Sequence, residues 1–184
     1  MQWLAIIVFS ILACISYGVI HDQITARICI EYFTIGHPQV LFVPSNDPTL
    51  LGFVWGIIAT WWVGVILGVP LAIVARIGSR PKRGVRSLIK PVALLLCCNA
   101  ILATIAGLVG YIAASNGWIW LVGSIAEKVP RDRHVSFLTD LWAHNASYLG
   151  GFLGGIILMR RVWRSREREL AVTHQQPRDE GEPV

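Results

Sequence analysis

Residues 51–90 read LGFVWGIIATWWVGVILGVPLAIVARIGSRPKRGVRSLIK, an apolar stretch that ends in a basic cluster. About 20 consecutive apolar residues cross the hydrocarbon core of a bilayer as a helix. Such a helix also satisfies its own backbone hydrogen bonds, which lipid cannot do. The stretch therefore predicts a membrane span at residues 51–75. Lys and Arg residues that follow a span mark its cytoplasmic side, so the stretch predicts a direction as well.

The composition of the whole chain agrees with a membrane protein. Of its 184 residues 54% are hydrophobic, and its mean hydropathy is +0.58, whereas soluble domains are roughly 45–50% apolar. Further apolar runs predict spans at residues 2–20, 91–114 and 137–159. We therefore expect an all-α integral membrane protein whose residues 1–164 form a four-transmembrane-helix bundle. Residues 165–184 are expected to be a polar, disordered cytoplasmic tail.

The first span is interpreted as a permanent helix and not as a cleaved signal peptide. No Lys or Arg precedes it, and its apolar run continues past Cys14 to Ile20. The cysteines match no zinc or disulfide pattern, so they are interpreted as small apolar side chains.

Lys and Arg are concentrated in two places. Twelve of the sixteen lie in two clusters, each after an apolar run: Arg76, Arg80, Lys82, Arg83, Arg86 and Lys90, and then Arg160, Arg161, Arg164, Arg166, Arg168 and Arg178. Both clusters are expected on the cytoplasmic side of a bacterial inner membrane, which also makes both termini cytoplasmic. The net charge of +5 then predicts contact with the bilayer and its anionic lipids, and not with nucleic acid.

Small residues recur every four positions in two of the predicted spans. They are Gly52, Gly56, Gly64 and Gly68 in the second span, and Gly150 and Gly154 in the fourth. Such stripes allow helix backbones to approach closely where lipid provides no hydrophobic driving force. Packing within one bundle is the plainer interpretation. A homo-oligomer, or a larger membrane complex, is the alternative.

The first outer loop shows a different pattern. Apolar residues alternate with polar ones over residues 24–31, which is typical of a strand. A second short apolar piece at residues 39–43 follows. Together they predict a partly extended loop, a candidate β-hairpin flap over the bundle.

This topology places four of the five histidines on the outer side of the membrane. With nearby acids they give a candidate set of metal ligands: His21, Glu31, His37, His134, Asp140 and His144. Imidazole and carboxylate groups suit zinc, iron, copper or manganese, so a transition metal at the outer face is the candidate cofactor. Asp140 and His144 lie four residues apart and share a helix face.

A purely structural interpretation of these residues stands beside the metal site. His21 and Asp22 are then the cap of a helix end, and Glu31 pairs with Arg27. The spacing contains no tight ligand motif such as HExxH.

The segment HDQITARICIEYFTIGHP at residues 21–38, with the later Asp140, His144 and Asn145, resembles a family of small bacterial four-span membrane proteins. That family has no established activity, so the resemblance implies the architecture alone.

Three functions remain open from the sequence. The chain carries no nucleotide-binding loop and no nucleophile motif, which favours a non-enzymatic accessory or scaffold component. The alternative is a small metalloprotein or redox protein with its site at the outer face. The third is transport of protons or a solute by an oligomer.

Overall fold

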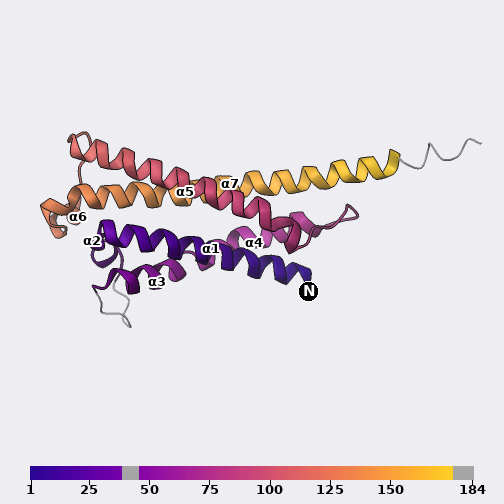
Figure 1. The fold of residues 1–184 in the computed structure, drawn as a ribbon, viewed down its shortest axis with the longest axis horizontal. Helices are drawn as coiled ribbons and strands as arrows, with labels where there is room; N and C mark the ends of the chain where they lie inside the picture. Colours follow the sequence, from indigo (N-terminus) through magenta and orange to yellow (C-terminus); the bar gives the residue numbers. More distant parts are fainter. Residues whose placement is uncertain (39–45, 176–184) are drawn as a thin grey trace, which may run out of the picture.

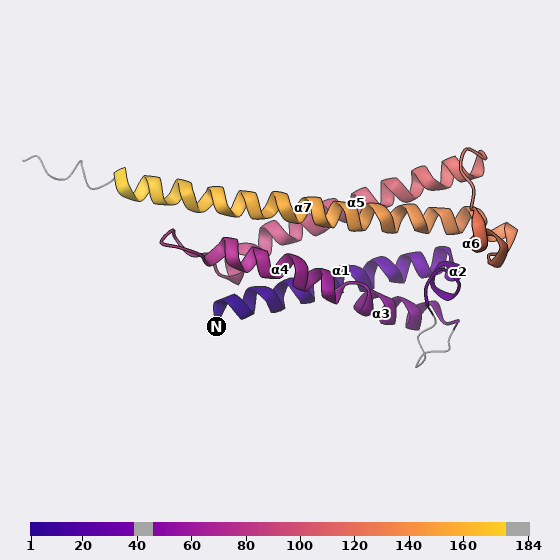
Figure 2. The ribbon, with the colours of Figure 1, turned by 180° about the vertical axis from the view of Figure 1, so that it is seen from behind.

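The computed structural model describes residues 1–38 and 46–175, and within these ranges every regular element is helical. The elements are α1 (Gln2–Ile28), α2 (Ile30–Thr34), α3 (Pro48–Ile58), α4 (Trp61–Arg76), α5 (Val85–Ser115), α6 (Gly123–Lys128), the 3-10 turn η1 (Arg131–Arg133) and α7 (His134–Gln175). The long helices form two layers (Figure 1). In one layer α5 packs along α7, and in the other α1 packs against α3 and α4. The view from behind shows the same pairing (Figure 2).

Three helical segments are long and apolar enough to cross a membrane, which indicates a membrane protein. They are Gln2–Ile28, Pro48–Arg76 and Val85–Ser115. The second segment comprises α3 and α4, which are separated by a break in the helix at Ala59 and Thr60. The fourth long helix, α7, is not among the three, and Asp140, His144 and Asn145 make its first half more polar.

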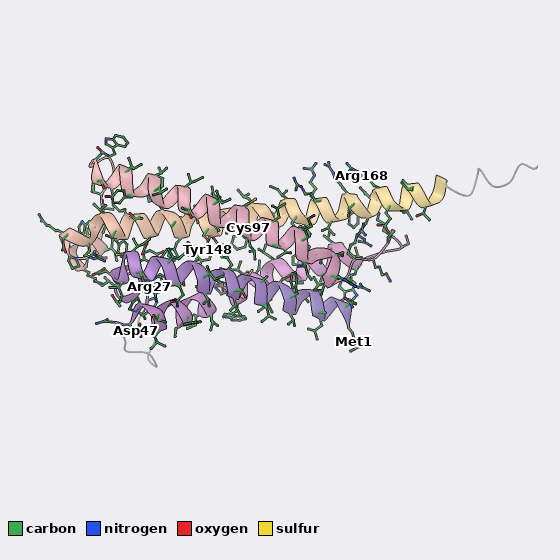
Figure 3. All side chains as sticks on the ribbon, in the orientation of Figure 1. Met1, Arg27, Asp47, Cys97, Tyr148 and Arg168 are labelled. Atoms are coloured by element: carbon green, nitrogen blue, oxygen red, sulfur yellow. The ribbon has the colours of Figure 1, made fainter. Side chains whose placement is uncertain are left out.

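The two ends of the bundle differ in chemistry. The N-terminus, the turn between α4 and α5 and the C-terminal part of α7 lie at one end, while α2 and α6 lie at the other (Figure 1). Figure 3 places Met1 and Arg168 toward the first end and Arg27 and Asp47 at the second. The described residues of both basic clusters therefore belong to the same end.

Glycines bring α1 and the α3–α4 segment into backbone contact. A Cβ atom built on Gly56 would lie 2.5 Å from the Cα of Val19, and one on Gly64 would lie 2.5 Å from the Cα of Ile11. Real Cβ atoms do not approach other atoms so closely, so only glycine fits at these two positions. The result is a long, closely packed seam that fixes how α1 sits against its neighbours.

A second glycine seam joins α5 and α7. A Cβ on Gly150 would lie 2.3 Å from Oδ1 of Asn99, and one on Gly154 would lie 2.1 Å from Cδ1 of Leu95. The glycine stripe of α7 therefore faces side chains of α5.

The segment expected to form an outer loop with a strand differs from that prediction, because α1 continues as a helix through Ile28. Cys29 then adopts an extended conformation, with φ −146° and ψ 96°, and α2 follows directly. Asp22, Thr25 and Ala26 are buried, whereas Ile24 and Ile28 are exposed. The buried residues are spaced as on one helix face, so the apolar alternation was the weaker signal. Residues 24–34 thus form no hairpin, and residues 39–43 lie outside the described residues.

The predicted tail begins as an extension of α7, which is helical as far as Gln175, and residues 176–184 lie outside the described residues. Arg166 in this extension is fully buried. Its Nε donates to the carbonyl of Pro81 at 2.8 Å and its Nη2 to that of Ile77 at 2.7 Å, with further bonds to the carbonyls of Val74 and Arg80. A cation here satisfies carbonyls in the last turn of α4 and in the turn that follows it.

Replacing Arg166 by Leu is expected to destabilise the bundle by about 2–4 kcal/mol, because several buried carbonyls lose a charged donor. The measurement is the thermal unfolding of the purified protein in detergent. Arg164→Leu, at an exposed position of the same helix, is the control and should leave unfolding nearly unchanged. Equal effects of the two variants would contradict the capping role.

Replacing Gly56 by Ala is expected to lower stability by about 1–3 kcal/mol, because the added methyl meets the backbone of α1. Gly151→Ala is the matched control, since a Cβ there would meet only Nδ2 of Asn99, at 3.9 Å. In that open position the better helix propensity of Ala should keep or raise stability. If Gly56→Ala unfolds at or above the unfolding temperature of Gly151→Ala, the close packing of α1 against Gly56 is contradicted.

Candidate metal centre

The C-terminal part of α1 contributes two adjacent side chains, His21 and Asp22. Asp22 is 5% exposed, and its backbone lies against Gly52, where a Cβ would be 3.0 Å from the carbonyl carbon of Asp22. The hydroxyl of Thr25 donates to the His21 carbonyl at 3.2 Å. The glycine seam therefore determines where the two side chains lie.

The third side chain, His144, comes from α7 and is 6% exposed. Its Nδ1 lies 2.8 Å from the backbone carbonyl of Asp140. A carbonyl only accepts hydrogen bonds, so Nδ1 carries the hydrogen. In the neutral ring Nε2 then presents a lone pair.

The three side chains converge across the interface between α1 and α7. One candidate ligand atom from each of His21, Asp22 and His144 lies within 4.8 Å of the other two. Nε2 of His144 is 3.3 Å from Oδ1 of Asp22. The two imidazole rings are 4.6 Å apart at their centroids and nearly perpendicular. Nε2 of His21 is buried and has no hydrogen-bond partner among the described residues.

This geometry calls for a cation. Nε2 of His144 faces a carboxylate oxygen of Asp22, and a buried pair of this kind is stable when a proton makes it a hydrogen-bonded ion pair or when a metal ion lies between the two atoms. Two ligand atoms about 2.0–2.1 Å from a tetrahedral metal ion lie about 3.3–3.4 Å apart. The 3.3 Å between Nε2 of His144 and Oδ1 of Asp22 falls in this range. Metal-bound histidines also usually donate their other N–H to a carbonyl or carboxylate, as His144 does.

Aromatic side chains cover the cluster on the side of α2. The ring of Tyr32 on α2 lies 4.4 Å from that of His144 and 4.9 Å from that of His37. Phe33 and Trp55 pack on the other sides of His37. Burial lowers the pKa of His37, although its hydrogen bond to the Tyr32 carbonyl acts in the opposite direction. The short helix α2 thus acts as a roof that separates the cluster from water.

A cavity of about 100 Å³ lies on the other side of the cluster, toward the middle of the bundle. All three cluster residues line it, together with Ala59 and Thr60 at the break between α3 and α4. The break frees the Ala59 carbonyl, which accepts a hydrogen bond from the hydroxyl of Tyr148 at 3.3 Å. Non-helical backbone at membrane depth is tolerated where it lines a cavity or is buried in protein.

The six candidates from the sequence divide into three groups. His21 and His144 belong to the cluster. His37 lines the same cavity, with Nδ1 hydrogen-bonded to Tyr32, and Asp140 is fully buried one turn before His144 with neither carboxyl oxygen partnered among the described residues. Glu31 and His134 make other contacts: Glu31 pairs with Arg133, and Nε2 of His134 lies 3.0 Å from the Val129 carbonyl.

The sequence-based set of ligands omitted Asp22. On the structural interpretation of the sequence, Asp22 is expected to cap a helix end together with His21. A signal was present nonetheless, since a carboxylate beside a histidine at the end of a span is a costly pair to bury.

Glu31 and Arg133 form a clamp between α2 and η1. Nε of Arg133 lies 3.0 Å from Oε2 of Glu31, and the Cys29 thiol donates to the same oxygen at 3.3 Å. Burial raises the pKa of Glu31, but hydrogen bonds to its own backbone N–H and to Arg133 outweigh burial, so the pKa lies below its usual value. The clamp holds the roof against the start of α7.

No protein-family model, curated protein or solved structure matches the chain. The functional argument therefore starts from the geometry of this cluster.

Replacing Arg133 by Gln is expected to lower stability near pH 7 by about 0.2–1 kcal/mol, the usual range for a partly exposed pair. The lowered pKa of Glu31 means that the pair stabilises the fold above the unfolded pKa of about 4.3, and that this contribution is lost as the pH falls through the folded pKa. The difference between wild type and variant should therefore shrink in acid, as measured by thermal unfolding from about pH 7 to pH 3. Arg131→Gln, at an exposed position of the same turn, is the control. If the stability difference between wild type and Arg133→Gln stays constant with pH, the ion pair between Glu31 and Arg133 is excluded as its cause.

Proposed function

We propose that this chain is a multi-pass protein of the bacterial inner membrane that binds a divalent transition-metal ion through His21, Asp22 and His144. The observation that carries the proposal is the buried Nε2 of His144, 3.3 Å from a carboxylate oxygen of Asp22, with the imidazole of His21 in reach. Two imidazoles and one carboxylate suit zinc, iron and manganese. Three protein ligands also leave part of the coordination sphere open, as in metal sites that handle a substrate.

The proposal includes α7 as a fourth span. Its polar side chains point into the bundle, as the burial of Asp140 and His144 illustrates, while Leu149, Leu153 and Ile156 are more than half exposed. This is the distribution that lipid demands of a helix with ionisable groups. The first half of α7 also runs beside α5, which is itself long and apolar enough to span.

The proposed orientation follows from charge. The first basic cluster lies around the turn between α4 and α5, and the described residues of the second lie in the C-terminal part of α7. Both segments are at the end of the bundle away from α2 and the candidate metal centre (Figure 1). If that end is cytoplasmic, as basic clusters usually are, both termini are cytoplasmic and the metal centre lies at the outer face.

The other two functions predict different outcomes. An accessory or scaffold component needs no metal and should tolerate changes to the cluster. A transporter needs a route through the inner half, where Leu71, Val92 and Leu158, which line the inner end of the cavity, belong to a tightly packed apolar cluster.

The test is metal analysis of the full chain, purified in detergent, stripped with a chelator and reloaded with zinc, iron(II) or manganese(II). Wild type should retain about one metal ion per chain. His144→Ala and Asp22→Asn should weaken binding at least about tenfold, because each removes a ligand. His134→Ala is the matched control, since that imidazole contacts the Val129 backbone instead.

Thermal unfolding of each apoprotein separates loss of a ligand from loss of the fold. Equal metal binding by His144→Ala and His134→Ala would refute the proposed site. Absence of metal from folded wild type would do the same and would favour the scaffold.

A further inference from the structure

A cavity lies beside the candidate metal centre, and a ligand in this cavity could reach the open coordination positions of a bound metal ion. His21, Asp22 and His144 all line this cavity, so a metal ion held by them lies in its wall. We propose that a small uncharged molecule of the diatomic class, which includes dioxygen and nitric oxide, enters this cavity and binds iron(II) at an open position. This inference rests on the metal site proposed above.

The size of the cavity limits the ligand to a few heavy atoms. Its volume is about 100 Å³, smaller than the cavity of about 150 Å³ that holds benzene in a protein core. A quinone ring or a sugar is therefore larger than this space.

The polarity of the wall excludes charged or strongly hydrogen-bonding ligands. The hydroxyl of Tyr17 and that of Ser147 bond to each other at 2.7 Å, and Ser10 donates to the carbonyl of Ile6. The hydroxyls of Thr60 and Tyr148 also donate to backbone carbonyls. Apart from the metal-binding groups, the unpartnered buried polar atom in the described wall is Oδ1 of Asn99. Most of the remaining wall is Ala, Val, Leu and Met, which suits a weakly polar molecule.

The donor set points to iron(II) as the partner of such a ligand. Two histidines and one carboxylate, with open positions beside them, form the ligand set of non-haem iron(II) sites that react with dioxygen. Here the aromatic roof covers one side of the cluster and the cavity lies on the other, so the open positions face the cavity.

Gly151 provides a way to change the cavity without touching a metal ligand. It lines the cavity, and a Cβ built on it would meet only Nδ2 of Asn99, at 3.9 Å. A larger side chain at this position therefore occupies cavity space and not space between helices.

The experiment uses the full chain in detergent, loaded with iron(II) without oxygen and titrated with nitric oxide. Bound iron is measured first, by elemental analysis. Formation of the iron–nitrosyl adduct is then followed by absorption and by its half-integer-spin EPR signal. Gly151→Ala and Gly151→Val are compared with wild type and with Ala100→Val, which enlarges an exposed side chain on α5.

We expect wild type and Ala100→Val to form the adduct, and Gly151→Val to bind iron normally but nitric oxide at least about tenfold more weakly. Gly151→Ala, the milder change, should give a smaller loss and keeps the test valid if the Val variant fails to fold. Normal iron content with no adduct, or with an adduct that both Gly151 variants leave unchanged, would overturn this inference alone. Failure of wild type to bind iron(II) or any other metal would overturn the proposed metal site, and this inference with it.

Discussion

The close contact between α1 and the α3–α4 segment is the constraint on which the rest of the structure depends. Lipid provides no hydrophobic drive for helix association, so the two helices adhere through backbone packing at glycines such as Gly56 and Gly64. A slip of one residue along α1 would rotate its side chains by about 100° and shift them about 1.5 Å. The seam therefore fixes His21 and Asp22 where the second pair, α5 and α7, presents His144.

The candidate metal centre follows from this arrangement of two helix pairs. Its ligands come from one helix of each pair, so a bound ion would join the two layers of the bundle. The roof of α2 and the Glu31–Arg133 clamp keep water from one side. The break at Ala59 and Thr60 helps to form the cavity on the other. A buried carboxylate that faces an imidazole nitrogen is stable when a proton or a metal ion lies between them.

Much of the fold could be predicted from local sequence. Apolar length predicts the three helical segments that are long and apolar enough to cross a membrane, and the recurrence of Gly52, Gly56 and Gly64 predicts close packing. The helical end of α1 could not be predicted from the alternation of Ile24 and Ile28, because those side chains face outward for reasons of tertiary packing. The helix break at Ala59 and Thr60 could not be predicted either, because neither residue is a proline or a glycine. The pairing of Asp22 with His144 becomes visible only when α7 lies beside α1, because pairing over a long sequence distance leaves no spacing motif.

The most direct test of the central claim is anomalous X-ray diffraction from crystals of the metal-loaded protein, recorded at the absorption edge of the metal. The account predicts one strong peak about 2.0–2.2 Å from a ring nitrogen of His21, a carboxylate oxygen of Asp22 and Nε2 of His144. A peak elsewhere, for example beside Glu31 or His134, or no peak in protein soaked at saturating metal, would contradict it.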